Sequence, residues 1–305
     1  MPKTEKSDQS GLSVVNIRVA AGLKRRWLLN VGLLVLVGAL AWILVYRSGQ
    51  EKQVSAPPLT TLSANSIAHI RIERPGQSAI VLEKTGNDWK ITDPLQARAN
   101  PFNVENLMRV LSAPGETRIP AVTTELAKFG LEQPQSRVWF ENDEVAFGVL
   151  HPLNNQVYVL YKNEVVLIPG YHLAGAIYPY NNYIDSRLFG EDRKFTSLKL
   201  PSFTLTLKDG IWQRQPPDKQ LTSDQINDFA SEWQNARALS VDKYSGKEAL
   251  DEIETTSTRD GKNEKLRLGI LAYKPDFVLH REDENLEYHF TEETGKHLLS
   301  LPSKE

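Results

Sequence analysis

The chain has 305 residues, of which 24% are charged and 40% hydrophobic, and this composition excludes both a disordered polyampholyte and a multi-span membrane protein. It contains no cysteine, which excludes disulfides, thiolate metal sites and cysteine nucleophiles. Residues 1–26 carry six Lys or Arg against two Asp or Glu, so the formal charge of −2 leaves a net −6 for the remainder. Because phosphate binding requires a basic surface, we expect no nucleic-acid partner.

Residues 27–46 form an apolar run in which Asn30 is the only strongly polar residue. Twenty helical residues span about 30 Å, the thickness of the hydrocarbon core of a bilayer. Basic residues at 24–26 directly precede the run, so we expect a transmembrane helix over residues 27–46, a cytoplasmic N-terminus over residues 1–26 and a body outside the cytoplasm. A cleaved signal peptide is the alternative, although its apolar region is usually only about 7–15 residues long.

Residues 47–60 contain the pair Pro57-Pro58 without an apolar period, and we expect them to form a short tether. Two copies of one plan follow, offset by roughly 120 residues. We expect a first α+β repeat over residues 61–190 and a second, degenerate one over residues 191–305. Each copy is predicted to contain a hairpin, a helix, a short helix and a strand meander, so the fold class is α+β with mainly antiparallel sheets.

Each predicted hairpin turns at a glycine, in Gly86-Asn87-Asp88 and in Asp209-Gly210. Trp89 and Trp212 follow these turns by one or two positions, and we expect both to occupy equivalent core positions. The strand runs that close the copies are residues 138–140, 145–149, 157–161 and 165–168 in the first, and 266–268, 277–280 and 286–290 in the second.

A longer helix is predicted between the hairpin and the meander of each copy. Asn100-Pro101 supplies an N-cap and a first-turn proline in the first copy, and Thr222 with Gln225 has the capping-box spacing in the second. Short helices are expected next, over residues 124–129 and residues 245–250.

The run Leu-Ala-Lys-Phe-Gly-Leu at residues 126–131, with Pro134 three residues on, resembles a bacterial family known as domain of unknown function 4340. The similarity extends from about residue 62 to residue 189, and the second copy, which lacks the Phe-Gly-Leu-x-x-Pro turn, matches more loosely. Further matching pieces are Leu82-Glu83-Lys84, Ile91-Thr92-Asp93-Pro94, Phe147-Gly148, Tyr158-Val159 and Asp185-Ser186-Arg187-Leu188. The resemblance implies an envelope protein with one N-terminal anchor, some relatives occurring alongside ABC-type export components, and it implies no catalytic residue.

The chain has no phosphate-binding loop, no dinucleotide-binding glycine motif, no His-Glu-x-x-His and no Gly-x-Ser-x-Gly, so we expect neither an enzyme nor a cofactor. His280 and His289, with Glu287, could bind a transition metal if their hairpin pairs symmetrically. We favour the alternative that they are sheet histidines flanking a solvated acidic turn at residues 282–284, and we expect no metal site.

Residues 171–187 are unusually rich in tyrosine and asparagine. Such side chains suit a protein interface or a glycan, but the same rings could fill a groove between the repeats. We expect Tyr171 and Tyr178 to pack inside and the later tyrosines to be exposed. The candidate binding residues are therefore Tyr180, Asn181, Asn182, Tyr183 and Arg187.

These features favour a non-enzymatic protein of the bacterial inner membrane, single-pass with its N-terminus inside, whose periplasmic body acts as a binding or scaffold module. Its expected partners are the bilayer, through residues 27–46, and an envelope or transporter protein, such as a component of an ABC-type export system. An extracytoplasmic module that binds a small molecule or glycan is the alternative. A hydrolase with an unrecognised site, built on acid pairs such as Asp185 with Glu191 or Glu282 with Glu284, is the third hypothesis.

Overall fold

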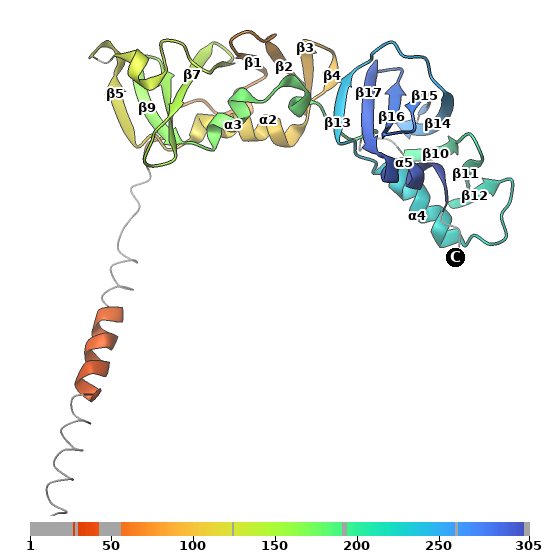
Figure 1. Ribbon diagram of the computed structural model, residues 1–305, viewed down its shortest axis with the longest axis horizontal. Coiled ribbons are helices and arrows are strands. Elements are labelled where there is room, and N and C mark those ends of the chain that lie inside the picture. Colours follow the sequence, from red (N-terminus) through yellow and green to blue (C-terminus); the bar gives the residue numbers. More distant parts are fainter. Residues whose placement is uncertain are drawn as a thin grey trace, which may run out of the picture. The chain divides into compact units, whose positions relative to one another are not determined.

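The chain divides into two units, Met1–Ser55 and Ala56–Glu305. A computed structural model describes residues 27, 30–42, 56–123, 125–190, 194–259 and 262–301 (Figure 1). Residues 30–42 are helical and exposed. The whole expected N-terminus (residues 1–26) lies outside the described residues. So do residues 28–29 and 43–46 of the expected membrane span and residues 47–55 of the expected tether. In the part of the chain that is described, no helix combines the length and apolar character needed to cross a membrane.

The first copy is built on a nine-stranded antiparallel sheet with the order β4-β3-β2-β1-β6-β7-β8-β9-β5. Its strands are β1 (His69–Glu73), β2 (Ile80–Thr85), β3 (Asp88–Asp93), β4 (Ala97–Arg98), β5 (Thr117–Pro120), β6 (Ser136–Phe140), β7 (Asp143–Leu150), β8 (Gln156–Tyr161) and β9 (Glu164–Pro169). Alternating apolar side chains from these strands, such as Ile70 and Ile72 of β1, are fully buried. Antiparallel hairpins with one buried face explain this alternation.

The second copy is built on an eight-stranded antiparallel sheet with the order β12-β11-β10-β14-β15-β16-β17-β13. Its strands are β10 (Lys194–Lys199), β11 (Thr204–Lys208), β12 (Ile211–Gln215), β13 (Ser240–Lys243), β14 (Asp251–Arg259), β15 (Lys262–Ala272), β16 (Asp276–Arg281) and β17 (Leu286–Thr291). The two orders agree strand for strand except that the first sheet has β4 beyond β3. The α+β class with two antiparallel sheets is therefore confirmed, while the repeat boundary near residue 190 stays a prediction.

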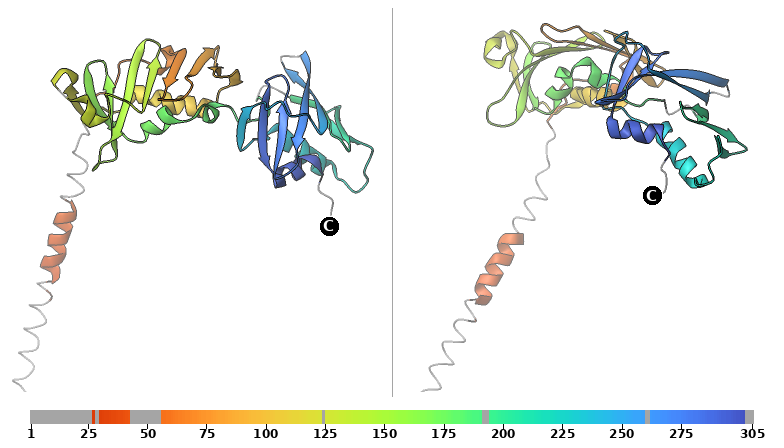
Figure 2. Two further views of the ribbon diagram at one scale, coloured as in Figure 1. Left: turned by 45° about the horizontal axis from the view of Figure 1, so that its top comes forward. Right: turned by 45° about the vertical axis from the view of Figure 1, so that its right-hand side comes forward.

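Helices lie between strands at matching places in the two copies, and Figure 2 shows them against the sheets. The helices are α2 (Pro101–Met108), α3 (His172–Ile177), α4 (Ser223–Gln234) and α5 (Glu292–Leu299), with 3-10 turns η1 (Ala64–Ser66), η2 (Arg109–Ser112), η3 (Ala121–Thr123), η4 (Leu126–Phe129) and η5 (Tyr180–Tyr183). The predicted caps are confirmed: Asn100 accepts hydrogen bonds from two backbone N–H groups of α2, and Thr222 with Gln225 forms the capping box of α4.

The short helix predicted near residue 126 is confirmed as η4, which ends at Gly130 in the left-handed conformation (φ 64°). Residue 124 lies outside the described residues. The backbone of η4 passes very close to β7, because a Cβ on Gly148 would stand 2.1 Å from the carbonyl oxygen of Phe129. The motif pieces around residues 126–131 and 147–148 thus pack directly on each other.

The short helix predicted over residues 245–250 is wrong, since residues 244–249 have no regular structure. The backbone N–H and the hydroxyl of Ser245 both donate to the Glu287 carboxylate, so Ser245 does not cap a helix. Gly246 has φ 83°, a left-handed conformation that no α-helix contains.

One long strand of the second copy, β14, was not predicted. Its side chains that face the core include Ile253, Thr255 and Ser257, all nearly fully buried. Because two of these three are hydroxyl residues, β14 lacks the apolar alternation that marks its neighbours. The predicted run at residues 266–268 is part of β15 and therefore corresponds to β7, not to β6.

Trp89 and Trp212 occupy the same register in their hairpins, opposite Lys84 and Leu207 respectively. Their equivalence is confirmed, and both pack against the hydrophobic core. Trp89 is buried, but Trp212 is only half-buried. The difference follows from the extra strand, since β4 covers the edge at β3 and no described strand covers β12.

Candidate functional site

The tyrosine-rich segment packs along the first copy more closely than the sequence predicted. Tyr183 is fully buried, and its hydroxyl donates to the carbonyl oxygen of Gly175 at 2.5 Å. Burial raises the pKa of Tyr183. Tyr178 is half-buried, and its ring centroid lies 6.4 Å from that of Tyr183, in agreement with the expectation that Tyr178 packs inside. The expected exposure of Tyr183 is therefore wrong, because η5 turns this ring into the core.

Tyr171 shows the opposite error. It was expected to pack inside but is exposed, because the chain at the start of α3 buries the neighbouring His172. Tyr180 and Asn181 are half-buried and Asn182 is exposed, although the carbonyl oxygen of Asn182 accepts a hydrogen bond from Asn103. Binding by Tyr180, Asn181 and Asn182 stays a prediction, but the buried Tyr183 does not join them on a surface.

Arg187, the fifth candidate, belongs to a cluster of charged groups between the two copies. Its Nε lies 2.9 Å from Oδ2 of Asp185, a carboxylate that also accepts from Nη1 of Arg98 at 2.9 Å. Arg98 of β4 also donates to Oε1 of Glu284 at 2.8 Å and to the backbone carbonyl of Arg187 at 2.6 Å. The Arg98 guanidinium thus connects three parts of the fold. These are strand β4 itself, residues 185–187 in the segment that leaves the first copy, and the β16–β17 turn.

Further members of this junction cluster come from the second copy. Arg281 is almost fully buried and donates to the backbone carbonyl of Leu188 and to Asp283, while the hydroxyl of Tyr288 donates to Glu284. Burial opposes the charge of Arg281, but its bond to Asp283 and the proximity of Glu284 outweigh burial and raise its pKa. Burial and Glu284 together raise the pKa of Tyr288, so its hydroxyl keeps the proton it donates.

The expectation that residues 282–284 form a freely solvated turn is therefore wrong for Glu284, whose carboxylate ion-pairs with Arg98 and Arg281. Charged side chains are rarely buried unless they are paired, and the junction cluster satisfies that condition. No pattern in the sequence indicates this cluster, because its members come from segments far apart along the chain. We interpret the cluster as a structural connection between the copies.

The histidine pair is separated by the strand register. His289 lies opposite Val278, and His280 lies opposite Glu287. The ring of His280 instead stacks on Tyr244, with centroids 3.6 Å apart and planes 7° apart. Across the described residues, no three or more His, Cys, Asp or Glu side chains gather in an arrangement that could hold a metal ion.

A difference between the sheet edges indicates a better candidate site. In the first copy, β4 pairs with β3, and the N–H of Ala99 donates to the carbonyl oxygen of Trp89 at 2.9 Å. In the second copy, β12 ends the sheet, and no described strand pairs with its outer side. Trp212 has the same register as Trp89, whose carbonyl group faces β4. The backbone N–H and C=O groups of Trp212, and of Arg214 two residues on, therefore point outward from the open edge of β12.

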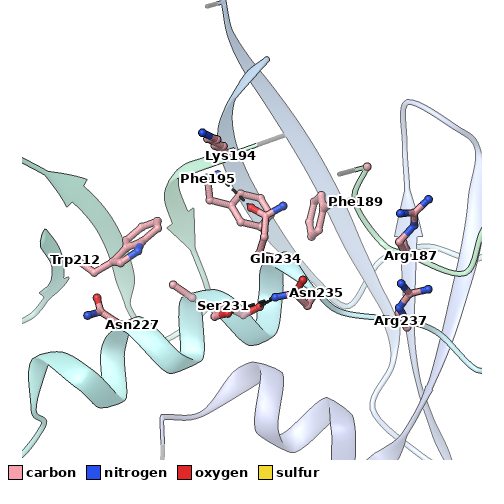
Figure 3. Close-up of a pocket in the computed structure, with 12 residues that line it drawn as sticks. Arg187, Phe189, Lys194, Phe195, Trp212, Asn227, Ser231, Gln234, Asn235 and Arg237 are labelled. Atoms are coloured by element: carbon pink, nitrogen blue, oxygen red, sulfur yellow. Dashed lines mark hydrogen bonds between the residues drawn. The ribbon is translucent and has the colours of Figure 1, made fainter. Parts of the chain in front are cut away.

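A groove of about 440 Å³ lies beside this open edge, between Trp212 and helix α4 (Figure 3). Trp212 and Asn227 lie at one end of it, and Arg187 and Arg237 lie at the other. The described residues that line the groove include three cations and no carboxylate; they are Arg187, Phe189, Gly190, Lys194, Phe195, Trp212, Asn227, Ala230, Ser231, Gln234, Asn235 and Arg237. We call this feature the β12 groove.

The β12 groove combines residue types that suit recognition. A half-buried indole offers apolar area, amides on α4 offer donors and acceptors, and the cations favour an anionic group. Some groups are already engaged, since Gln234 accepts from the N–H of Phe195 and Asn235 donates to the carbonyl of Ser231.

Sequence reasoning identified Trp212 and α4 but treated them as core. No local pattern marked the missing strand. With Trp89 and Trp212 aligned, Pro217 of the second copy corresponds to Pro94 of the first, and the first copy still forms β4 three residues after its proline.

The fold and the β12 groove define a duplicated antiparallel α+β protein in which β3 is covered by a further strand and its equivalent, β12, is not. Residues 89–256, more than half of the chain, match the family described as domain of unknown function (DUF4340), and the chain belongs to this family. The resemblance found in the sequence is thereby confirmed, and the matched range contains every residue that lines the β12 groove. No protein of curated function and no solved structure matches the chain.

Proposed function

We propose that the protein is a non-enzymatic binding module, anchored in the bacterial inner membrane, whose periplasmic body binds an extended segment of a partner protein at the β12 edge. One observation carries this proposal. The first copy covers its β3 edge with its own strand β4, whereas the second copy leaves the equivalent edge open beside a groove.

Strand addition to an open sheet edge is a general mode of peptide recognition. The outward N–H and C=O groups of Trp212 and Arg214 would supply main-chain hydrogen bonds, and the groove would supply specificity. Because Lys194, Arg187 and Arg237 line the groove, a partner segment with an acidic side chain fits best. An envelope protein or a subunit of an ABC-type export system is the expected owner of that segment.

The proposed anchor rests on the chemistry of residues 27–46. Over residues 30–42 the helix exposes large apolar side chains on all sides, among them Leu33, Leu36 and Trp42. A helix that is apolar all round needs either a protein core or a bilayer around it. The basic residues before it support an N-terminus in the cytoplasm and a single pass.

A glycan or other small extracytoplasmic molecule is the second candidate ligand. The Trp212 indole and the Asn227 amide lie at the same end of the groove (Figure 3), which supports a sugar ligand. Flat rings suit the faces of sugars, and amides suit their hydroxyl groups. The two candidates differ in what they use: a strand needs the backbone edge, whereas a sugar needs only the groove.

Photo-crosslinking in the native cells tests the proposal. A photoreactive residue at Ile211, an exposed position of β12, should yield a protein adduct whose crosslinked peptide is an extended segment. The matched control is Leu239, equally apolar and exposed but next to β13 at the opposite edge of the same sheet. Arg214→Pro removes an outward N–H and should abolish the adduct while the variant still melts cooperatively.

Equal adducts from positions 211 and 239 would contradict the strand-addition proposal. An adduct that carries carbohydrate and persists in Arg214→Pro would favour the glycan candidate instead.

A further inference from the structure

Three exposed apolar side chains lie together at one end of the first copy. Leu153, in the β7–β8 loop, is 89% exposed, Tyr171 is 69% exposed and Leu150 is 49% exposed. A methyl group of Leu150 lies 3.0 Å from where a Cβ of Gly170 would stand, so Leu150 lies beside the residue that precedes Tyr171. We call these three residues the apolar tip.

The apolar tip is presented by a hydrogen-bonded loop. The N–H of Gly170 donates to the carbonyl oxygen of Asn155 at 2.9 Å, which ties the loop to the end of β9. The N–H of Leu153 donates to Nδ1 of His151 at 3.2 Å. These bonds hold the loop in one shape, so the exposed leucine is a feature of the fold.

The two sequence stretches that build the apolar tip are uncharged, and the charged side chains beside them, Glu116 on Gln156 and Arg109 near His172, come from other segments. Residues 145–161 and 165–184, which together supply the loop and the start of α3, contain no Asp, Glu, Lys or Arg. In a chain with 24% charged residues, two such stretches meeting at one end are unusual for a surface that faces only water.

The first described residues of the folded body run along the edge strand β5, from the neighbourhood of this end toward the β8–β9 turn. The carbonyl oxygen of Pro57 accepts from the N–H of Gly115, and the next residue, Glu116, accepts from the side chain of Gln156, which ends the β7–β8 loop. Only residues 47–55 separate the expected membrane helix from residue 56. Nine extended residues reach at most about 30 Å, which sets an upper limit on the distance between residue 56 and the end of the expected membrane helix.

We propose that the apolar tip docks on the surface of the bilayer that holds the N-terminal helix, an inference that rests on the proposed membrane anchor. Leu150, Leu153 and Tyr171 enter the boundary between headgroups and acyl chains, where tyrosine and leucine side chains are favoured. Since the apolar tip carries no charged group, contact depends on apolar burial and changes little with anionic lipid or salt.

Because the chain has no cysteine, one introduced cysteine gives a single labelling position for the test. Leu153→Cys carries an environment-sensitive fluorophore, and Val122→Cys is the matched control. Val122 is 86% exposed but lies at the opposite end of the sheet, where the N–H of Ala121 donates to the carbonyl of Asn163 in the β8–β9 turn.

The full chain is reconstituted into phosphatidylcholine vesicles that contain a lipid-borne spin-label quencher. The label at position 153 should shift to the blue and lose at least about half of its emission to the quencher, as expected for a group at the headgroup boundary, while the label at position 122 should not change. Tyr171→Gln should reduce the quenching at position 153 without lowering the melting temperature. Equal quenching at positions 153 and 122 would overturn the proposal.

A second arrangement separates docking from anchoring. Residues 56–305 form a compact unit and can be held on vesicles by an N-terminal histidine tag and a nickel-chelating lipid. Quenching at position 153 in this arrangement would support docking of the apolar tip. Failure of vesicles to retain the full chain would overturn only the anchor. A retained full chain without selective quenching would overturn only the docking.

Discussion

His172 is buried at the first position of α3, immediately after the exposed Tyr171. Burial, with a smaller effect of the nearby Arg109 charge, lowers its pKa from 6.5 to about 4. No described residue bonds to its Nε2. The folded protein therefore holds this imidazole neutral at pH values where the unfolded chain protonates it.

This difference predicts acid sensitivity with a definite sign. Above pH 6.5 neither state binds the proton, whereas between pH 6.5 and about 4 the unfolded state binds it and the folded state does not, so stability falls as the pH falls. The full loss is on the order of 3 kcal/mol, from about 2.5 pKa units at 1.36 kcal/mol each, and most of it should be complete by pH 4.5. Chemical denaturation at pH 7 and pH 4.5 measures it.

His172→Phe should remove this part of the pH dependence, and the exposed His297→Gln should leave it unchanged. A wild-type and a His172→Phe protein with the same loss of stability at pH 4.5 would show that His172 is not responsible.

At the scale of residues, composition indicated that some tyrosines pack and others do not, but it could not assign them. Tyr171 precedes an apolar helix and Tyr183 follows two asparagines, yet Tyr171 is exposed and Tyr183 is buried, because the direction in which α3 and η5 turn decides their burial. The charged members of the junction cluster were equally unpredictable, because the partners of Arg98 lie 87 and 186 residues away.

Elements were predicted best where local chemistry decides them. The caps of α2 and α4 depend on residues within one turn, and both were predicted correctly. Strand β14 was missed because Thr255 and Ser257 occupy buried positions that are usually apolar. The open edge of β12 could not be predicted, because it is defined by a strand that the second copy lacks.

The packing of η4 on β7 predicts a strong effect of a single methyl group. Gly148→Ala would place a Cβ 2.1 Å from a backbone oxygen of Phe129 and 3.0 Å from Leu131, and the backbone cannot rotate away as a side chain can. We expect a loss of about 2–4 kcal/mol in the free energy of unfolding, as for severe overpacking.

Gly175→Ala is the matched control, because its Cβ would meet Leu107 at 3.6 Å, an ordinary contact, inside helix α3. Its stability should be unchanged or higher by up to about 1 kcal/mol, from helix propensity and reduced freedom of the unfolded chain. Similar melting temperatures for both variants would contradict the close approach of η4 and β7.

On the scale of the whole body, the junction cluster connects the two copies through Arg98. Its guanidinium contacts Asp185, Glu284 and Tyr288, and each of the three loses one of its partners if it is removed. Burial opposes the charge of Arg98, but Glu284, Tyr288 and Asp185 outweigh burial and raise its pKa.

Arg98→Ala should therefore destabilise the body by at most about 3–5 kcal/mol, the cost of leaving a buried charge without any partner, because Asp185 keeps Arg187 and Glu284 keeps Arg281. Arg109→Ala is the control, since its exposed pair with Glu105 on α2 contributes at most about 0.5 kcal/mol. A double-mutant cycle with Glu284→Gln, followed by urea unfolding, should give a coupling of at least about 1 kcal/mol. Additive effects would show that the two side chains do not act together.

The long reach of Arg98 has a consequence for biosynthesis. The first sheet has all its strands once residue 169 has emerged, so it can form while the second copy is still being made. Glu284, however, follows Arg98 by 186 residues, and at a synthesis rate of about 5–20 residues per second this cation waits roughly 10–40 seconds for this carboxylate. During that interval Asp185 is the only one of its two carboxylate partners that has been made, so the arginine is half-satisfied until the second copy folds against it.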